Sequence, residues 1–211
     1  MALIDDLINA GYLKTPRIIA AFRAIKRKDF LPPDLPHRCI AAEMDEAVAI
    51  GFAQTISQPA TVAFMLELLQ PRPGDKIMDI GYGSGWTGAL LAHIVSQNGA
   101  RGKVVAIERI KPLAEFGKEN LAKYGFVKNR AVQCVIGDGS KGYLPQAPYD
   151  RILASAVAPS VPPAWEAQLK TGGTIVAPVQ NALAKIEKSR NNTFSETRYE
   201  GFAFVPLVQG S

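Results

Sequence analysis

From residue 73 onward, short apolar segments alternate with segments of helical periodicity, and this alternation leaves few folds open to the chain. Strand–helix–strand units of this length build a parallel sheet with right-handed crossovers. We therefore expect an α/β fold with a doubly wound, mostly parallel, Rossmann-like sheet and helices on both faces. The expected elements are strands at 77–80, 104–107, 131–136, 149–155 and 174–179, and helices at 86–97, 112–124 and 162–169.

The first 70 residues do not show this alternation of strands and helices. A short helix is predicted at 3–10, and a second begins at Pro16, since proline at the first helical position loses no hydrogen bond. The prolines between 31 and 36 force extended chain, and a helix resumes over 59–69. These segments predict a helical extension in front of the sheet.

The last segment, 183–208, alternates apolar and polar residues on either side of Asn191-Asn192. This pattern predicts an antiparallel hairpin. We expect one domain over 1–211, made of an N-terminal helical extension and substrate loop (1–70), a cofactor-binding core (71–180) and a C-terminal hairpin (181–211).

Composition and charge narrow the class of protein. Hydrophobic residues make up 47% and charged residues 20%, which is ordinary for a globular chain and excludes a disordered one. No apolar run is long enough to span a bilayer, and Met1–Asp6 is acidic where a secretory signal is basic. We therefore expect a cytoplasmic protein with no membrane partner.

The net charge of +5 could favour polyanions. The basic residues are scattered, however, apart from Lys26-Arg27-Lys28, and no aromatic side chains interleave with them as a stacking platform requires. A solvated basic surface with no specific nucleic-acid partner is the better interpretation.

A glycine loop follows the first core strand, with the sequence Asp79-Ile80-Gly81-Tyr82-Gly83-Ser84-Gly85. Glycines permit a tight turn and the close approach of a ligand to the backbone. The helix that follows offers free N–H groups, which favour an anionic group such as a carboxylate. The loop therefore predicts a cofactor site with Asp79, Gly81, Tyr82, Gly83 and Gly85.

A dinucleotide site would need a third glycine three residues after Gly83, and that position is Trp86. The spacing instead resembles the first motif of class I methyltransferases, in which the loop wraps the methionine part of S-adenosylmethionine. Glu108 ends the second core strand, where it can accept hydrogen bonds from ribose hydroxyls. Asp138, beside Gly139, follows the third strand and could meet the adenine amino group.

Over nearly its whole length the chain resembles the protein-L-isoaspartate O-methyltransferase family. The most specific match is 50–59, IGFAQTISQP, just before the nucleotide fold. Further matching segments are 68–69, 73–75, Glu108-Arg109, 137–143, 147–150, 156–159, 169–173 and 204–207.

The resemblance implies methyl transfer from S-adenosylmethionine to the α-carboxylate of L-isoaspartyl residues in damaged proteins, leaving S-adenosylhomocysteine. The ester then collapses to a succinimide, which begins repair. Isoaspartyl proteins and peptides would be the substrates, and we expect a monomer. Carried over by motif, Ser57 is the active-site hydroxyl; the residues expected at the cofactor are Gln54, Thr55, Ile56, Ser57, Glu108, Arg109, Asp138 and Gly139.

The residues are chemically consistent with that reaction. A carboxylate is ionised at neutral pH, so the nucleophile needs no general base, and a serine hydroxyl can orient it. His37 lies in a proline-rich loop and His93 in an apolar helix, so both are interpreted as structural, and no metal cluster is expected. The alternative role for Ser57 is a helix cap before Pro59.

The chain also departs from the family pattern. The stretch 42–48 lacks a tyrosine and a proline, Ala53 stands where glycine is common, and Trp86 is bulkier than usual. Two alternatives stay open: a class I methyltransferase for a small molecule or RNA, and a cofactor-binding or interaction module with weakened turnover.

Overall fold

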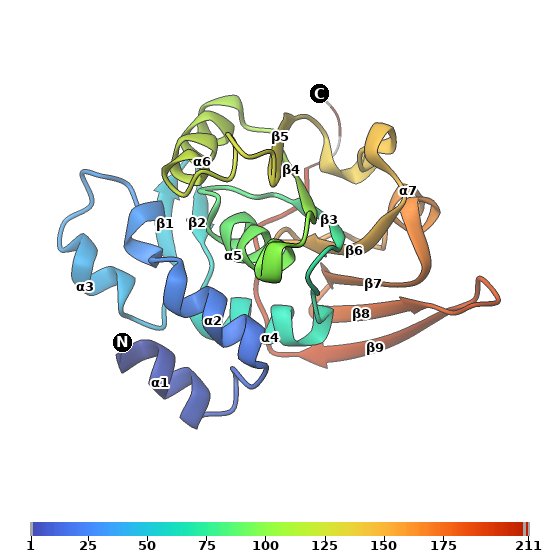
Figure 1. The fold of residues 1–211 in the computed structure, drawn as a ribbon, viewed down its shortest axis with the longest axis horizontal. Coiled ribbons are helices and arrows are strands. Elements are labelled where there is room, and N and C mark those ends of the chain that lie inside the picture. Colours follow the sequence, from blue (N-terminus) through green and yellow to red (C-terminus); the bar gives the residue numbers. More distant parts are fainter. Residues whose placement is uncertain (1, 209, 211) are drawn as a thin grey trace.

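The structure is a computed structural model that describes residues 2–208 and 210. Its strands are β1 Val48–Gly51, β2 Gln54–Ile56, β3 Lys76–Ile80, β4 Lys103–Glu108, β5 Val132–Ile136, β6 Tyr149–Ala154, β7 Leu169–Val179, β8 Ala182–Lys188 and β9 Phe194–Glu200. The central seven-stranded sheet has the order β5-β4-β3-β6-β7-β8-β9, and β1 and β2 form a separate hairpin (Figure 1). Only the pairs of β8 with β7 and β9 are antiparallel within the central sheet.

Helices cover both faces of this sheet. They are α1 Ala2–Asn9, α2 Pro16–Ala24, α3 Arg38–Ala42, α4 Pro59–Leu69, α5 Trp86–Val95, α6 Lys111–Lys123 and α7 Pro163–Gln168, with 3-10 turns η1 Arg27–Phe30, η2 Gln97–Gly99, η3 Gly139–Lys141 and η4 Leu144–Gln146. The doubly wound α/β fold with a C-terminal antiparallel hairpin, expected from the sequence, is confirmed.

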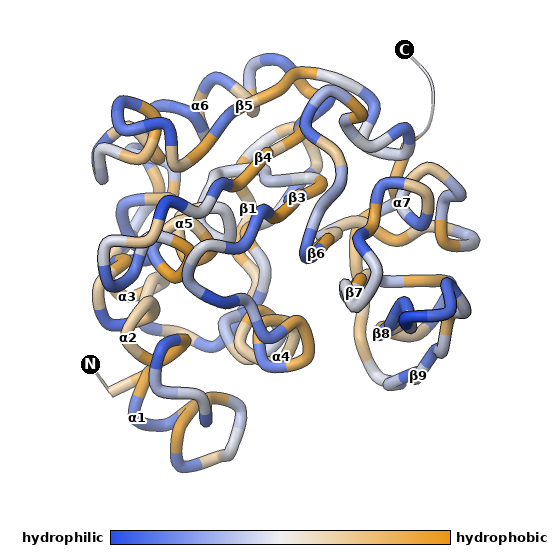
Figure 2. The backbone as a smooth tube through the Cα atoms, turned by 45° about the vertical axis from the view of Figure 1, so that its right-hand side comes forward, coloured by the Kyte–Doolittle hydropathy of each residue, from blue (hydrophilic) through white to orange (hydrophobic). Residues whose placement is uncertain are grey.

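Side-chain alternation along the strands separates two apolar layers. Ile77 of β3 belongs to the cluster that contains the buried residues of α4, α5 and α6, whereas the next residue, Met78, belongs to the cluster around Trp165 of α7. Both side chains are fully buried. Figure 2 shows hydrophobic stretches along the central strands and a hydrophilic turn between β8 and β9.

The order of the strands around β3 indicates where a ligand should bind. The chain leaves β3 for β4 on one side and returns to β6 on the other, so the strand order reverses at β3. In open α/β sheets, ligands bind outside the carboxyl ends of the strands at such a switch point. The glycine loop begins at this point, directly after Ile80.

Three local predictions need correction. Helix α3 and the β1–β2 hairpin were not expected, because each is too short to show a clear period. Strand β7 begins at Leu169, within the segment expected to be helical. The C-terminal hairpin ends at Glu200, and 201–208 follow a separate path.

The basic segment at 26–28 is not wholly solvated, contrary to the interpretation from sequence. Arg27 is only 6% exposed, because it begins η1 and its side chain enters the protein. Within 2–208, no helix is both long and apolar enough to cross a membrane. The cytoplasmic location remains a prediction.

Candidate functional site

A cavity of about 940 Å³ lies at the carboxyl ends of the strands. This volume is at the upper end of the range of small-molecule sites. Several of the residues predicted for the site line it: Gln54, Thr55, Ile56, Ser57, Gly81, Tyr82, Gly83, Glu108, Arg109 and Gly139. Asp79, Gly85 and Asp138 are not among its lining residues.

Two glycines of the loop face the cavity with left-handed backbone. Gly81 has φ +73° and Gly83 has φ +52°, conformations that favour glycine. A Cβ on Gly83 would lie 3.4 Å from Cδ1 of Ile50 in β1, across the cavity wall. The loop is thus shaped for close approach of a ligand to its backbone.

Gly85 has a different task. With φ +91° it is the N-cap of α5, and a Cβ there would lie 2.8 Å from the carbonyl oxygen of Gly117 in α6. Gly117 in turn leaves no room for a Cβ against the carbonyl oxygen of Gly83. The last glycine of the motif therefore serves the contact between the loop and α6 rather than the cavity.

Hydrogen bonds fasten the loop to the same helix. The Tyr82 hydroxyl donates to the carbonyl oxygen of Ala114 over 2.8 Å, and the Asn120 amide donates to that of Ser84 over 3.0 Å. Both Tyr82 and Asn120 are buried, and burial raises the pKa of the Tyr82 hydroxyl, which stays protonated. Reasoning from the sequence missed Asn120, because no local pattern distinguishes it from a surface helix residue.

Glu108 stands at the end of β4 and is 7% exposed. Its Oε2 accepts from the Gly83 N–H over 3.2 Å, and its Oε1 accepts from the Ile110 N–H over 3.0 Å. A carboxylate has further acceptor positions beyond these two bonds. Glu108 therefore links the glycine loop to the end of β4 and still has acceptor capacity toward the cavity.

Asp79 is fully buried on β3, and neither of its carboxylate oxygens has a hydrogen-bond partner among the described residues. Burial, with a smaller contribution from the Glu108 charge, raises the pKa of Asp79 to about 7. A Cβ on Gly88 of α5 would lie 3.1 Å from Oδ2, so the carboxyl group lies against that helix. Asp79 does not line the cavity.

Asp138 precedes η3, and its carboxylate already has partners within the chain. Oδ1 accepts from both the amide and the hydroxyl of Ser140, and Oδ2 accepts from the Gly210 N–H over 3.0 Å. Hydrogen bonds from Ser140 and Gly210, together with Lys141, hold the pKa of Asp138 below its usual value, against the opposing effect of burial. Its role at an adenine amino group remains a prediction.

The β1–β2 hairpin forms the opposite wall. Gly51 pairs with Gln54, so Phe52 and Ala53 are the two turn residues, and both have φ +54°. Positive φ at both central positions is the pattern of a type I′ turn, which favours asparagine and glycine. Neither Phe52 nor Ala53 is such a residue, so the chain carries backbone strain at this turn.

Ser57 follows β2 and faces the cavity, but the helix cap lies elsewhere. The N-cap residue of α4 is Gln58, and it makes no side-chain capping bond. Instead, Asp45 accepts from the Ala60 N–H over 2.7 Å through Oδ1 and from Gln58 Nε2 over 3.1 Å through Oδ2. The alternative interpretation of Ser57 as the cap is therefore wrong.

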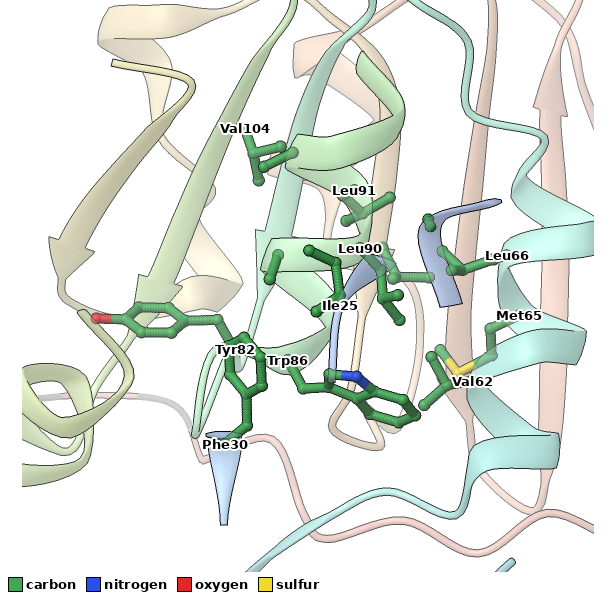
Figure 3. Packing of buried hydrophobic residues seen from close by; sticks show 14 of the residues in the cluster. Ile25, Phe30, Val62, Met65, Leu66, Tyr82, Trp86, Leu90, Leu91 and Val104 are labelled. Atoms are coloured by element: carbon green, nitrogen blue, oxygen red, sulfur yellow. The ribbon is translucent and has the colours of Figure 1, made fainter. Parts of the chain in front are cut away.

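Trp86 begins α5 and is 3% exposed, with its ring in the apolar core. Figure 3 shows the indole beside the side chains of Val62 and Met65. Its ring meets that of Phe22 edge-on, with centroids 5.6 Å apart. Trp86 therefore forms part of the cavity wall and leaves the cavity open.

The C-terminal segment also lines the cavity, which the sequence alone did not indicate. The lining includes 200–208 along with Tyr12, Thr87 and Ala156. Val157 holds this segment, since its N–H donates to the carbonyl oxygen of Val205 and its own carbonyl accepts from the Leu207 N–H, each over 2.8 Å. The only signal was the resemblance of 204–207 to the family.

The residues present fit S-adenosylmethionine. Gly81 and Gly83 present backbone without a side chain to the cavity, so a ligand can approach them closely, and Glu108 lines the same cavity as a possible acceptor for ribose hydroxyls. Apolar Ile107, Ile110 and Leu113 add surface for a flat ring. Within the described part of the chain, no cluster of His, Cys, Asp and Glu could hold a metal ion.

Solved structures share this fold. A Plasmodium falciparum chain described as a protein-L-isoaspartate O-methyltransferase in complex with S-adenosyl-L-homocysteine matches with a TM-score of 0.86 at 20% identity, covering 99% of this chain and 98% of that one. Another protein-L-isoaspartate O-methyltransferase matches with a TM-score of 0.87 at 25% identity, covering 99% and 65%. Fold and site together define a class I methyltransferase.

Sequence comparison identifies the family. The family model described as protein-L-isoaspartate(D-aspartate) O-methyltransferase matches residues 1–211, and the chain belongs to this family. It is 43% identical over 210 residues to the protein-L-isoaspartate O-methyltransferase of Methanopyrus kandleri, covering 98% of this chain and 89% of the relative. The corresponding protein of Aeropyrum pernix is 40% identical over 212 residues, covering 99% and 78%. As a family member, the chain is an S-adenosylmethionine-dependent methyltransferase.

Proposed function

We propose that this protein transfers a methyl group from S-adenosylmethionine to the α-carboxylate of L-isoaspartyl residues in damaged proteins. The observation that carries the proposal is that one cavity joins the glycine loop at Gly81–Gly83 to Ser57 at the end of the hairpin. Membership of the family supports the substrate class. The ester product would collapse to a succinimide and so begin repair.

The residues at the carboxyl ends of β3 to β5 would hold the cofactor. Gly81, Tyr82 and Gly83 would enclose its methionine part, and Glu108 would accept from its ribose hydroxyls. When bound, the cofactor supplies a methyl group on a sulfonium cation. The site's own contribution is to keep the two reactants in close, aligned contact and to exclude water.

Ser57 would orient the substrate carboxylate by donating a hydrogen bond to one of its oxygens. The other oxygen would remain the nucleophile, and it needs no base because a carboxylate is ionised at neutral pH. His93 lies in α5, and burial lowers its pKa, so at neutral pH it is uncharged. None of the lining residues in the described part of the chain is a histidine.

The direct test is methyl transfer from radiolabelled S-adenosylmethionine to an isoaspartyl peptide, with the matching aspartyl peptide as control. We expect label only in the isoaspartyl peptide, in a base-labile ester. If the cofactor binds and neither peptide is labelled, the proposed substrate is wrong. Label appearing in total RNA instead would support the RNA methyltransferase alternative.

We further propose that one chain forms a complete site and acts as a monomer. Support comes from the cavity lining, which this chain supplies from its N-terminal, central and C-terminal segments. Sedimentation with activity measured across a hundredfold dilution tests this, and specific activity should not change.

A further inference from the structure

Arg27 is a buried cation that the proposed reaction does not use. It is 6% exposed, and its guanidinium carbon lies 5.4 Å from the centroid of the Trp86 ring. Burial lowers the pKa of Arg27 to about 10, and the Asp45 charge opposes that shift, so the side chain is a cation at neutral pH. Burying a charge is costly unless hydrogen bonds compensate it.

The compensating bonds go to backbone on both sides of the β1–β2 hairpin. Before β1, Arg27 Nη1 donates to the carbonyl oxygens of Ala41 (3.0 Å) and Met44 (3.2 Å), and Nη2 donates to that of Glu46 (2.6 Å). After β2, Nη2 also donates to the carbonyl oxygen of Ser57 (3.3 Å). One planar group therefore holds the entry and the exit of the hairpin together.

The hairpin needs such support. A two-stranded hairpin has marginal stability by itself, and this one has a strained turn at Phe52 and Ala53. No strand of the central sheet pairs with it among the described residues. Tertiary contacts must therefore hold its position.

Asp45 completes the arrangement on the other side of Ser57. Its carboxylate holds the side chain of Gln58 and the N–H of Ala60, at the first turn of α4. Arg27 thus holds the carbonyl group of Ser57 itself, and Asp45 holds the helix start that follows it. Asp45 is thus the acidic side chain of 42–48 that makes these contacts.

We propose that Arg27 is a positioning residue for the substrate side of the site. Its hydrogen bonds to the backbone at both ends of the β1–β2 hairpin fix Ser57 relative to the glycine loop, and Asp45 assists by holding the start of α4. Arg27 acts through backbone and touches no reacting atom. The inference rests on the proposed function, because it takes Ser57 as the group that meets the peptide.

The test compares Arg27→Lys with the parent. A lysine keeps the charge but presents it from a single ammonium, which cannot reach backbone on both sides of the hairpin. We expect KM for the isoaspartyl peptide to rise about tenfold, while the Kd for S-adenosylhomocysteine stays within about twofold. In hydrogen exchange, the amides of 44–57 should exchange about tenfold faster, with those of 76–80 unchanged.

Arg151→Lys is the matched control. Arg151 is also a largely buried arginine that donates to backbone, through Nε to Leu69 over 3.0 Å and through Nη1 to Asp150 over 2.8 Å, but it does not line the cavity. We expect this variant to leave peptide KM and exchange at 44–57 unchanged, even if it lowers the melting temperature.

Asp45→Ala serves as the second variant if Arg27→Lys does not fold. It should raise peptide KM several-fold and leave cofactor affinity unchanged. Unchanged exchange at 44–57 in Arg27→Lys, or an equal loss of cofactor affinity in either variant, overturns the positioning role. The exchange measurement needs no turnover, so a parent protein that fails to methylate the peptide refutes the proposed function alone.

Discussion

The glycine loop and the β1–β2 hairpin face the same cavity, but different parts of the fold hold them. The loop continues directly from β3, in the middle of the sheet, and its backbone meets α6 through Gly85 and Gly117. The hairpin pairs only with itself among the described residues, and side chains of Arg27 and Asp45 attach it to the rest of the chain.

Because of this difference, substitutions on the two sides should have different effects. On the loop side, close backbone packing means that the geometry survives as long as the sheet and α6 stay together. On the hairpin side, Ile50 and Ile56 pack in the core, and the polar side chains of Arg27 and Asp45 fix the backbone on either side, so a single substitution can move Ser57 without unfolding the protein. Changes on the loop side should therefore appear in stability and cofactor affinity, and changes on the hairpin side in peptide kinetics.

The largest expected effect tests the buried carboxyl group under the loop. The pKa of Asp79 is raised from 3.8 to about 7, so the folded state retains a proton that the unfolded state releases. The unfolding free energy contributed by this group therefore falls as pH rises from 4 to 7, by up to about 4 kcal/mol. Asp79→Asn removes this dependence.

Denaturant unfolding of the parent and Asp79→Asn at several pH values between 4 and 8 measures this pH dependence of the unfolding free energy. The difference between the two unfolding free energies should shift in favour of Asp79→Asn as pH rises. Parallel curves would contradict burial of an uncompensated carboxyl group at this position.

The second prediction removes the acceptor at the end of β4. Glu108→Ala loses the bonds to the Gly83 and Ile110 N–H groups and the proposed bonds to ribose, which is worth about 3 kcal/mol. We expect the Kd for S-adenosylhomocysteine to rise about a hundredfold in calorimetry. Glu108→Gln keeps one acceptor oxygen, so its affinity for S-adenosylhomocysteine should fall less. Equal affinity in the parent and both variants would show that Glu108 does not help to bind the cofactor.

The third prediction concerns the hairpin side. Ser57→Ala removes one hydroxyl donor. We expect kcat/KM for the isoaspartyl peptide to fall roughly tenfold, which corresponds to a loss of about 1–2 kcal/mol of transition-state stabilisation. Cofactor affinity should fall far less than in Glu108→Ala, because Ser57 offers one hydroxyl and the other predicted cofactor contacts remain. Ser189→Ala, at an exposed hydroxyl that is hydrogen bonded to Thr193 in the turn between β8 and β9, is the matched control and should leave peptide kinetics intact. A loss of cofactor affinity in Ser57→Ala as large as that in Glu108→Ala would contradict the distinction between the two sides.

The smallest effect tests strain at the turn. Ala53 has φ +54°, so Ala53→Gly should raise the unfolding free energy by about 0.5–1 kcal/mol. Ala49→Gly, in β1 of the same hairpin, makes the same chemical change in extended backbone and should lower it by a similar amount. Thermal unfolding of both variants decides the matter, and the same sign in both would refute the strain.

Much of the fold could be predicted, because long periodic segments carry their own signal. Helix α4 occurs over the predicted residues, and β3 to β6 lie within a few residues of their expected positions. Short elements carry too few residues to show a period, so α3 and the β1–β2 hairpin were missed. Their positions depend on partners distant in sequence, such as Arg27.

The glycine spacing, the strand-end acid at Glu108 and the segment 50–59 are local patterns, so the sequence by itself determined the class of fold, the cofactor and the family. Which side chains face the cavity depends on contacts between distant segments. Only the tertiary structure placed the Asp79 carboxyl group against α5, turned Gly85 toward α6 and brought 200–208 to the cavity. The tertiary structure also decided that Arg27 is buried. A basic side chain is normally exposed to water, and it can be buried only where the folded backbone offers carbonyl groups as hydrogen-bond acceptors.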